Sequence, residues 1–179
     1  QVDVAIERAS FELAAGQALA AVDVLAAVPV AARARPEAAA RLDAALITAR
    51  HAAGLALLAD GQAARAATML DQAAAGARGE QATAIRCDLA LAAVATGDRE
   101  RARPRLAAIA RLTCPFPPPA DTQAVPILTA FVDGLGPRRA AAAADRLEAL
   151  ARSATGVSRQ LAATALRVMA MNAAEQRSE

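Results

Sequence analysis

Trp and Tyr are absent from this 179-residue chain, and its three Phe residues lie far apart along the sequence. Alanine, the strongest helix former, makes up about a third of the residues instead. The β-branched and aromatic residues that favour strands are scarce and scattered. The composition therefore excludes a sheet-rich protein and predicts a chain that is helical almost throughout.

Lysine is also absent, so all 20 positively charged residues are arginines. They alternate with Asp and Glu from Arg8 to Arg177 instead of gathering in one stripe, and the formal net charge is only +2. Binding to nucleic acid needs a basic cluster or stripe, so we expect no nucleic-acid partner. The use of arginine without lysine indicates a GC-rich genome, from which we infer a bacterial source.

No run reaches the ~20 apolar residues that are needed to cross a membrane, so we expect no membrane insertion. The chain begins at Gln1 and not at Met, which suggests that upstream residues, such as a signal peptide or a further domain, are missing. A cytoplasmic location is expected. The alternative is a periplasmic or secreted protein, if Gln1 follows a cleaved signal peptide.

Histidine occurs once, at His51, and cysteine twice, at Cys87 and Cys114. The sequence has no CxxC pair, no ExxH motif and no glycine-rich phosphate loop, which argues against a zinc site and nucleotide chemistry. A catalytic Ser/His/Asp or Cys/His set would have to use His51, and nothing in the sequence pairs it with a nucleophile. We therefore expect no enzyme activity, no metal and no cofactor. A disulfide between the cysteines would indicate an oxidising compartment, but the sequence does not show how far apart they lie.

Apolar residues recur at helical spacing along most of the chain, and glycine or proline interrupts them. Gly16, Gly61 and Gly97 stand where helices should end, because glycine adopts a positive φ at little cost. Pro36 and Pro137 suit the first turn of a helix, where their missing N–H is not needed. The pattern predicts about nine helices, arranged as four hairpins and a terminal helix. Pro104 either lies in a first turn that starts late or kinks its helix.

Each of the three turn glycines is followed by an alanine after five residues, a leucine after nine and an apolar residue after twelve. A small residue also precedes each glycine by seven positions: Ala9, Gly54 and Ala90. This pattern resembles the tetratricopeptide repeat, a family of stacked helix-turn-helix units of 34 residues. The resemblance is closest over residues 41–112, since the glycines are 45 and 36 residues apart and the family's large aromatic residues are missing.

The resemblance implies an all-α fold, in which antiparallel helical hairpins stack into a right-handed solenoid. We expect a single domain over residues 1–179, with a proline-rich loop at 113–121 and C-terminal helices in 122–179. In this family the first helix of each hairpin lines a concave groove. The matching positions predict a mostly apolar groove for a partner helix or peptide, lined by Thr48, His51, Leu55, Leu58, Cys87, Leu91 and Val94. The alternative is that the chain's own next helix or its terminal segment covers Leu55 and Leu91.

Two further surface features could contact a partner. Arg99 and Arg103 form one basic row on a helix, with Arg101 and Arg105 beside it, and the rows either receive an acidic partner or form a solvated face balanced by nearby carboxylates. Phe116 lies among the prolines of the 113–121 loop, which could present it to a partner at low entropic cost. The alternative is that Phe116 packs back onto its own domain.

These patterns predict a non-enzymatic scaffold or protein-interaction module with a protein or peptide partner. The alternative function is a compact helical bundle that senses a small ligand, as the effector domain of a bacterial regulator. X-ray scattering separates the two, because a solenoid is elongated whereas a globular bundle of this size has a radius of gyration of ~16 Å.

Overall fold

A computed structural model describes residues 1–109, 112, 114, 124–135, 139–154, 159, 162–163, 165–166 and 169–170. The regular elements in these residues are eight α-helices and one 3₁₀ helix, which confirms the predicted all-α class. The chain divides into two compact units, Gln1–Ala92 and Ala93–Glu179.

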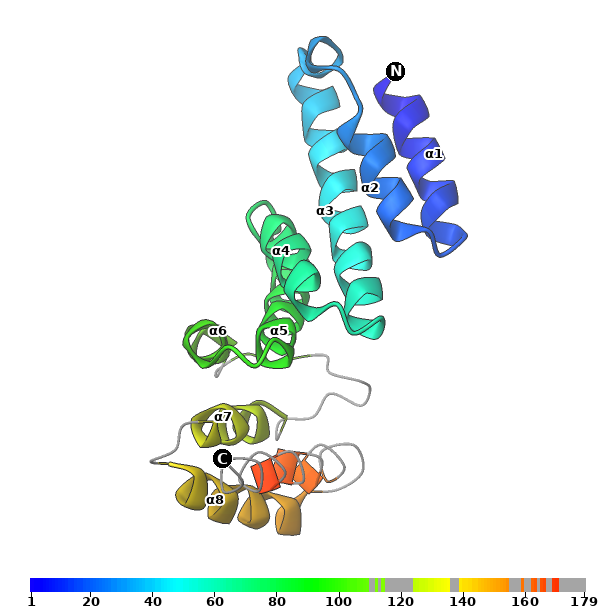
Figure 1. Cartoon of the computed structure of the whole chain (residues 1–179). Helices are drawn as coiled ribbons and strands as arrows, with labels where there is room; N and C mark the ends of the chain where they lie inside the picture. The colour runs from blue at the N-terminus through cyan, green and yellow to red at the C-terminus, as the bar shows by residue number, and fades with distance from the viewer. Residues whose placement is uncertain are drawn as a thin grey trace. The chain divides into compact units, whose positions relative to one another are not determined.

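The first unit is built around a long central helix, α3 (Pro36–Ala59), which starts at Pro36 as predicted. Before it come α1 (Val2–Ala14), α2 (Ala18–Ala26) and the short 3₁₀ helix η1 (Val30–Arg33). After it come α4 (Ala63–Ala74) and α5 (Gly79–Ala95), whose last turn belongs to the second unit. Helix α3 contacts α1, α2, η1 and α4, and α1 lies at the outer edge of the unit (Figure 1).

Two hydrophobic clusters hold the first unit together, and α3 contributes to both. Its N-terminal half packs Leu42 and Leu46 against α1 and α2. Its C-terminal half packs Leu57 against Leu70 of α4 and Leu89 of α5. Helix α3 therefore joins the first hairpin to the helices that follow it.

Helix α3 is also long and apolar enough to cross a membrane, judged by length and composition alone. The core helix of a protein without any membrane segment passes the same test. Helix α3 contacts four neighbouring elements, and 33% of its most apolar stretch is buried. The absence of membrane insertion stays a prediction.

The turns after α1 and α3 have the same backbone structure. Gly16 and Gly61 have φ values of +76° and +74°, which an L-residue with a side chain rarely adopts. In both turns the glycine N–H donates to the carbonyl three residues back at 3.0 Å, and the next N–H donates to the carbonyl five residues back at 2.8 Å. This double hydrogen bond is the Schellman motif, so the positions at which these two helices end were predicted correctly.

Helices α3 and α4 pack most tightly at Gly54. A Cβ atom placed there would lie 2.5 Å from Cγ of Leu70, which is fully buried. The atoms nearest to this position all belong to Leu70, which lies one turn beyond Ala66 along α4.

The second unit contains α6 (Arg99–Ile109), α7 (Ala124–Gly134) and α8 (Ala140–Ser153), and α7 packs against both of the others. Pro104 lies inside α6, so the helix does not start late. Ile127 and Leu147 are central to a buried cluster that also includes Met169. The predicted proline-rich loop lies outside the described residues apart from Cys114, and so do Pro137 and most of the predicted ninth helix.

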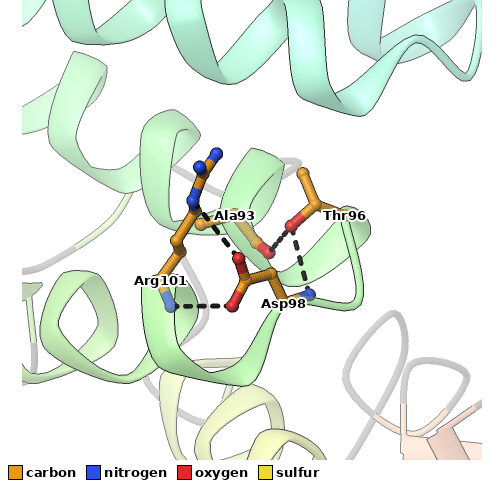
Figure 2. A network of polar contacts seen from close by, with 4 residues as sticks. All are labelled: Ala93, Thr96, Asp98 and Arg101. Carbon is orange, nitrogen blue, oxygen red and sulfur yellow. Dashed lines mark hydrogen bonds and ion pairs between the residues drawn. The ribbon is translucent and has the colours of Figure 1, made fainter.

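Asp98 fixes the start of α6 (Figure 2). Its Oδ1 atom accepts a hydrogen bond from the Arg101 N–H at 3.2 Å, and its Oδ2 atom lies 3.2 Å from Nε of Arg101. The Thr96 hydroxyl donates to the Ala93 carbonyl at 2.7 Å and accepts a bond from the Asp98 N–H at 3.3 Å. Together with Gly97, which has a φ of +72°, these bonds form the predicted turn at residues 96–98.

Candidate functional site

In the first unit, polar contacts join α3 to α5 at two points. Nε2 of His51 lies 2.6 Å from Oδ2 of Asp88. About one helical turn earlier on α3, the Gln81 side-chain amide donates to the Thr48 hydroxyl at 3.3 Å. These polar contacts add to the hydrophobic packing of Leu57 on α3 against Leu89 on α5.

On each helix, leucines follow the polar residue at helical spacing. Leu55 and Leu58 follow His51 on α3 by four and seven residues, and Leu91 follows Asp88 on α5 by three. Residues at these offsets lie on the same side of a helix. We call this surface the α3–α5 face. Its residues are Thr48, His51, Leu55, Leu58, Gln81, Asp88 and Leu91.

The His51 and Asp88 side chains are partly buried, with 21% and 19% of their surfaces exposed. The pair can act as a neutral hydrogen bond or as an ion pair, depending on the protonation of the imidazole. The Thr48 hydroxyl donates to the Ala44 carbonyl at 3.2 Å, so its proton is engaged within its own helix. Among the described residues, no group of three or more His, Cys, Asp or Glu side chains could hold a metal ion.

The sequence did not identify Asp88 as the partner of His51. A signal was present in the repeat register, because Gly54 and Ala90 are equivalent positions 36 residues apart. The same offset from His51 reaches Cys87, which is next to Asp88. Equivalent positions of stacked first helices lie close together, so the register pointed to the right turn of α5.

The leucines of the α3–α5 face differ in exposure. Leu55 is 42% exposed, whereas Leu58 and Leu91 are half-buried and Thr48 is exposed. Cys87 and Val94 were also predicted to line the groove, but they are only 0% and 7% exposed. Both side chains point into the protein, because α5 is buried around most of its circumference, and they form no part of an accessible surface.

Both cysteines are disulfide-bonded, and neither Cys87 nor Cys114 is a free thiol. Cys114 is buried as well, with 3% of its surface exposed. The sequence left a disulfide open as one alternative, because spacing along the chain does not fix the distance between two side chains.

The predicted basic rows on α6 are partly neutralised. Nε of Arg103 lies 3.5 Å from Oδ1 of Asp133 on α7, and Arg101 pairs with Asp98. Arg99 begins α6, but its side chain is outside the described part of the structure, as is all of Phe116. Of these arginines, Arg101 and Arg103 therefore already have carboxylate partners, and the binding of an acidic partner by the rows stays a prediction.

The surface of the first unit also has two shallow depressions that the sequence did not reveal. One has a volume of about 480 Å³ and contains the ion pair between Asp3 and Arg41, at 2.8 Å. The other, of about 450 Å³, is mostly apolar and lies between α1 and α2, with Val4, Ala5, Arg8, Val24, Ala27 and Val28 among its lining residues. Both depend on how the start of α1 meets later elements, which no local pattern encodes.

We compared the chain with models of known families, with curated proteins and with solved structures. None of the three comparisons found a match.

Proposed function

We propose that this chain is a non-enzymatic protein-interaction module, built from tetratricopeptide-like helical hairpins, that binds a helix or peptide of a partner protein along the α3–α5 face. The observation that carries this proposal is the 42% exposure of Leu55, with Leu58 half-buried one turn further along α3 and Leu91 half-buried on α5. Apolar side chains that lie together at a surface are typical of a site that another protein covers.

The three hairpin turns support the proposed repeat. Their glycines all have φ between +72° and +76°. The alanine five residues after each glycine is fully buried, and the leucine nine residues after it is at most 2% exposed. These residues are Ala21 and Leu25, Ala66 and Leu70, and Ala102 and Leu106. The same sequence positions thus have the same environments in all three hairpins.

The chemistry of the face favours a partner segment with one apolar side. Its leucine end offers apolar contact, and its other end is polar, where the exposed Thr48 and Gln81 side chains bond each other. An amphipathic helix places anchors at i, i+3 or i+4 and i+7, which suits such a surface. No arginine belongs to the α3–α5 face, so it lacks the cations that would hold a C-terminal carboxylate.

The test starts with a peptide library displayed on phage and selected against the full chain. We expect the selected peptides to carry apolar residues at helical spacing. Leu55→Arg with Leu91→Arg should weaken their binding at least about tenfold, because the change puts two charges into the apolar contact. Fluorescence anisotropy measures the affinities, and circular dichroism verifies that each variant is folded.

Leu19→Arg is the matched control, because Leu19 is an exposed leucine on α2, away from the α3–α5 face. It should leave peptide binding unchanged. A selection that returns no binder, or binders that tolerate the double change, would count against the α3–α5 face as the working surface.

A further inference from the structure

The outward face of α1 carries a second apolar surface, separate from the α3–α5 face. Val4 and Phe11 lie on it two turns apart, and they are 67% and 69% exposed. The opposite side of the helix buries Val2 and Ala9 against the core of the first unit. The apolar depression between α1 and α2 borders the Val4 end of this surface. Covering these two side chains would remove their exposed apolar area from water.

Charged residues flank the two apolar side chains. Arg8 lies between Val4 and Phe11 on the same face, and Glu12 follows Arg8 by one turn along the same edge of the helix. Among the described residues, neither Arg8 nor Glu12 has an ion-pair partner. The edge thus offers one positive and one negative group about 6 Å apart along the helix axis.

We propose that α1 mediates a symmetric dimer, in which the α1 helices of two copies pack antiparallel through this face. A two-fold axis across two antiparallel helices brings the same edge of each helix together, and every contact occurs twice. Arg8 then lies beside Glu12 of the second copy, and Glu12 lies beside Arg8 of that copy. The charge pattern of α1 is therefore complementary to itself in the antiparallel arrangement.

The alignment that places Arg8 beside Glu12 of the second copy also determines what the apolar residues contact. The axis passes close to residue 10, so the two Phe11 rings meet near it, where an aromatic pair is favourable. Val4 at one end lies opposite the small residues Ala15 and Gly16 of the second copy. No two like charges face each other, because the other edge of α1 places Glu7 opposite uncharged residues of the second copy.

The size of α1 limits the strength of this dimer. The helix has 13 residues and is about 20 Å long, so two such helices bury less than a standard interface. We expect reversible association with a dissociation constant on the order of 100 μM.

Sedimentation equilibrium of the full chain, from about 5 μM to about 1 mM, measures the association. Phe11→Glu should weaken it at least about tenfold, because two charges would meet at the axis. Ala56→Glu is the matched control, since it puts the same charge at an exposed position of α3 that belongs to neither proposed surface, and it should leave association unchanged. A wild-type chain that stays monomeric throughout, or a dimer that survives Phe11→Glu or is lost equally in Ala56→Glu, would overturn the proposal.

Charge exchange tests the antiparallel register. Arg8→Glu and Glu12→Arg should each weaken the dimer about tenfold, because each replaces two attractive contacts with two repulsive ones. The double variant Arg8→Glu, Glu12→Arg should recover to within about threefold of the wild type. A double variant as weak as the single ones would overturn the proposed pairing, whichever surface then forms the dimer.

Discussion

At the level of single residues, Gly54 lies so close to the Leu70 side chain that there is no room for a Cβ atom. Gly54→Ala would place a methyl group against Leu70, which is fully buried and has little space to move. We expect the free energy of unfolding to fall by ~1–3 kcal/mol from overpacking, with about 1 kcal/mol offset by the higher helix propensity of alanine. Urea denaturation measures the change.

Leu70→Ala provides the control for this prediction, because it opens the space that the new methyl group needs. Gly54→Ala should therefore cost less in the Leu70→Ala background than in the wild type. Equal costs in both backgrounds would contradict the close contact.

At the level of elements, the start of α6 depends on Asp98. Asp98→Ala removes the acceptor for the Arg101 N–H and should lower the stability of the second unit by about 0.5–2 kcal/mol, measured by thermal denaturation. Asp98→Asn keeps a side-chain oxygen for this hydrogen bond and should cost much less. If Asn is as damaging as Ala, the stabilisation comes from the ion pair with Arg101 and not from the cap.

The elements also show which features a sequence can reveal. The ends of α1 and α3 could be predicted, since Gly16 and Gly61 act locally through the backbone conformation that they permit. The contact between His51 and Asp88 could be predicted only as far as the turn of α5 that carries it, because the exact partner depends on how α3 and α5 are rotated about their axes. Cys87 shows the same limit, since the sequence placed it on an accessible face and the structure buries it. The leucines at Leu55 and Leu91 could be assigned to a surface, but the sequence does not encode what covers them.

At the level of the whole molecule, the disulfide-bonded form of the two cysteines indicates the kind of compartment in which the protein folds. Neither is a free thiol, and structural disulfides persist in oxidising compartments. Protein purified from its native source should therefore take up no iodoacetamide when it is unfolded without a reductant. Two adducts should appear after reduction, and mass spectrometry counts them. Alkylation of the unreduced chain would contradict the disulfide and would favour a cytoplasmic location.

Helix α3 couples the unfolding of the two hydrophobic clusters of the first unit. Its N-terminal half completes one hydrophobic cluster and its C-terminal half completes the other, so a single uninterrupted helix belongs to both. If one cluster dissolves, half of α3 loses its packing, and an unsupported helical segment of that length is marginal in water. The loss of either cluster thus weakens the helix on which the other depends. The hairpins of this unit are consequently coupled, and they should melt together in one cooperative transition instead of peeling off one at a time.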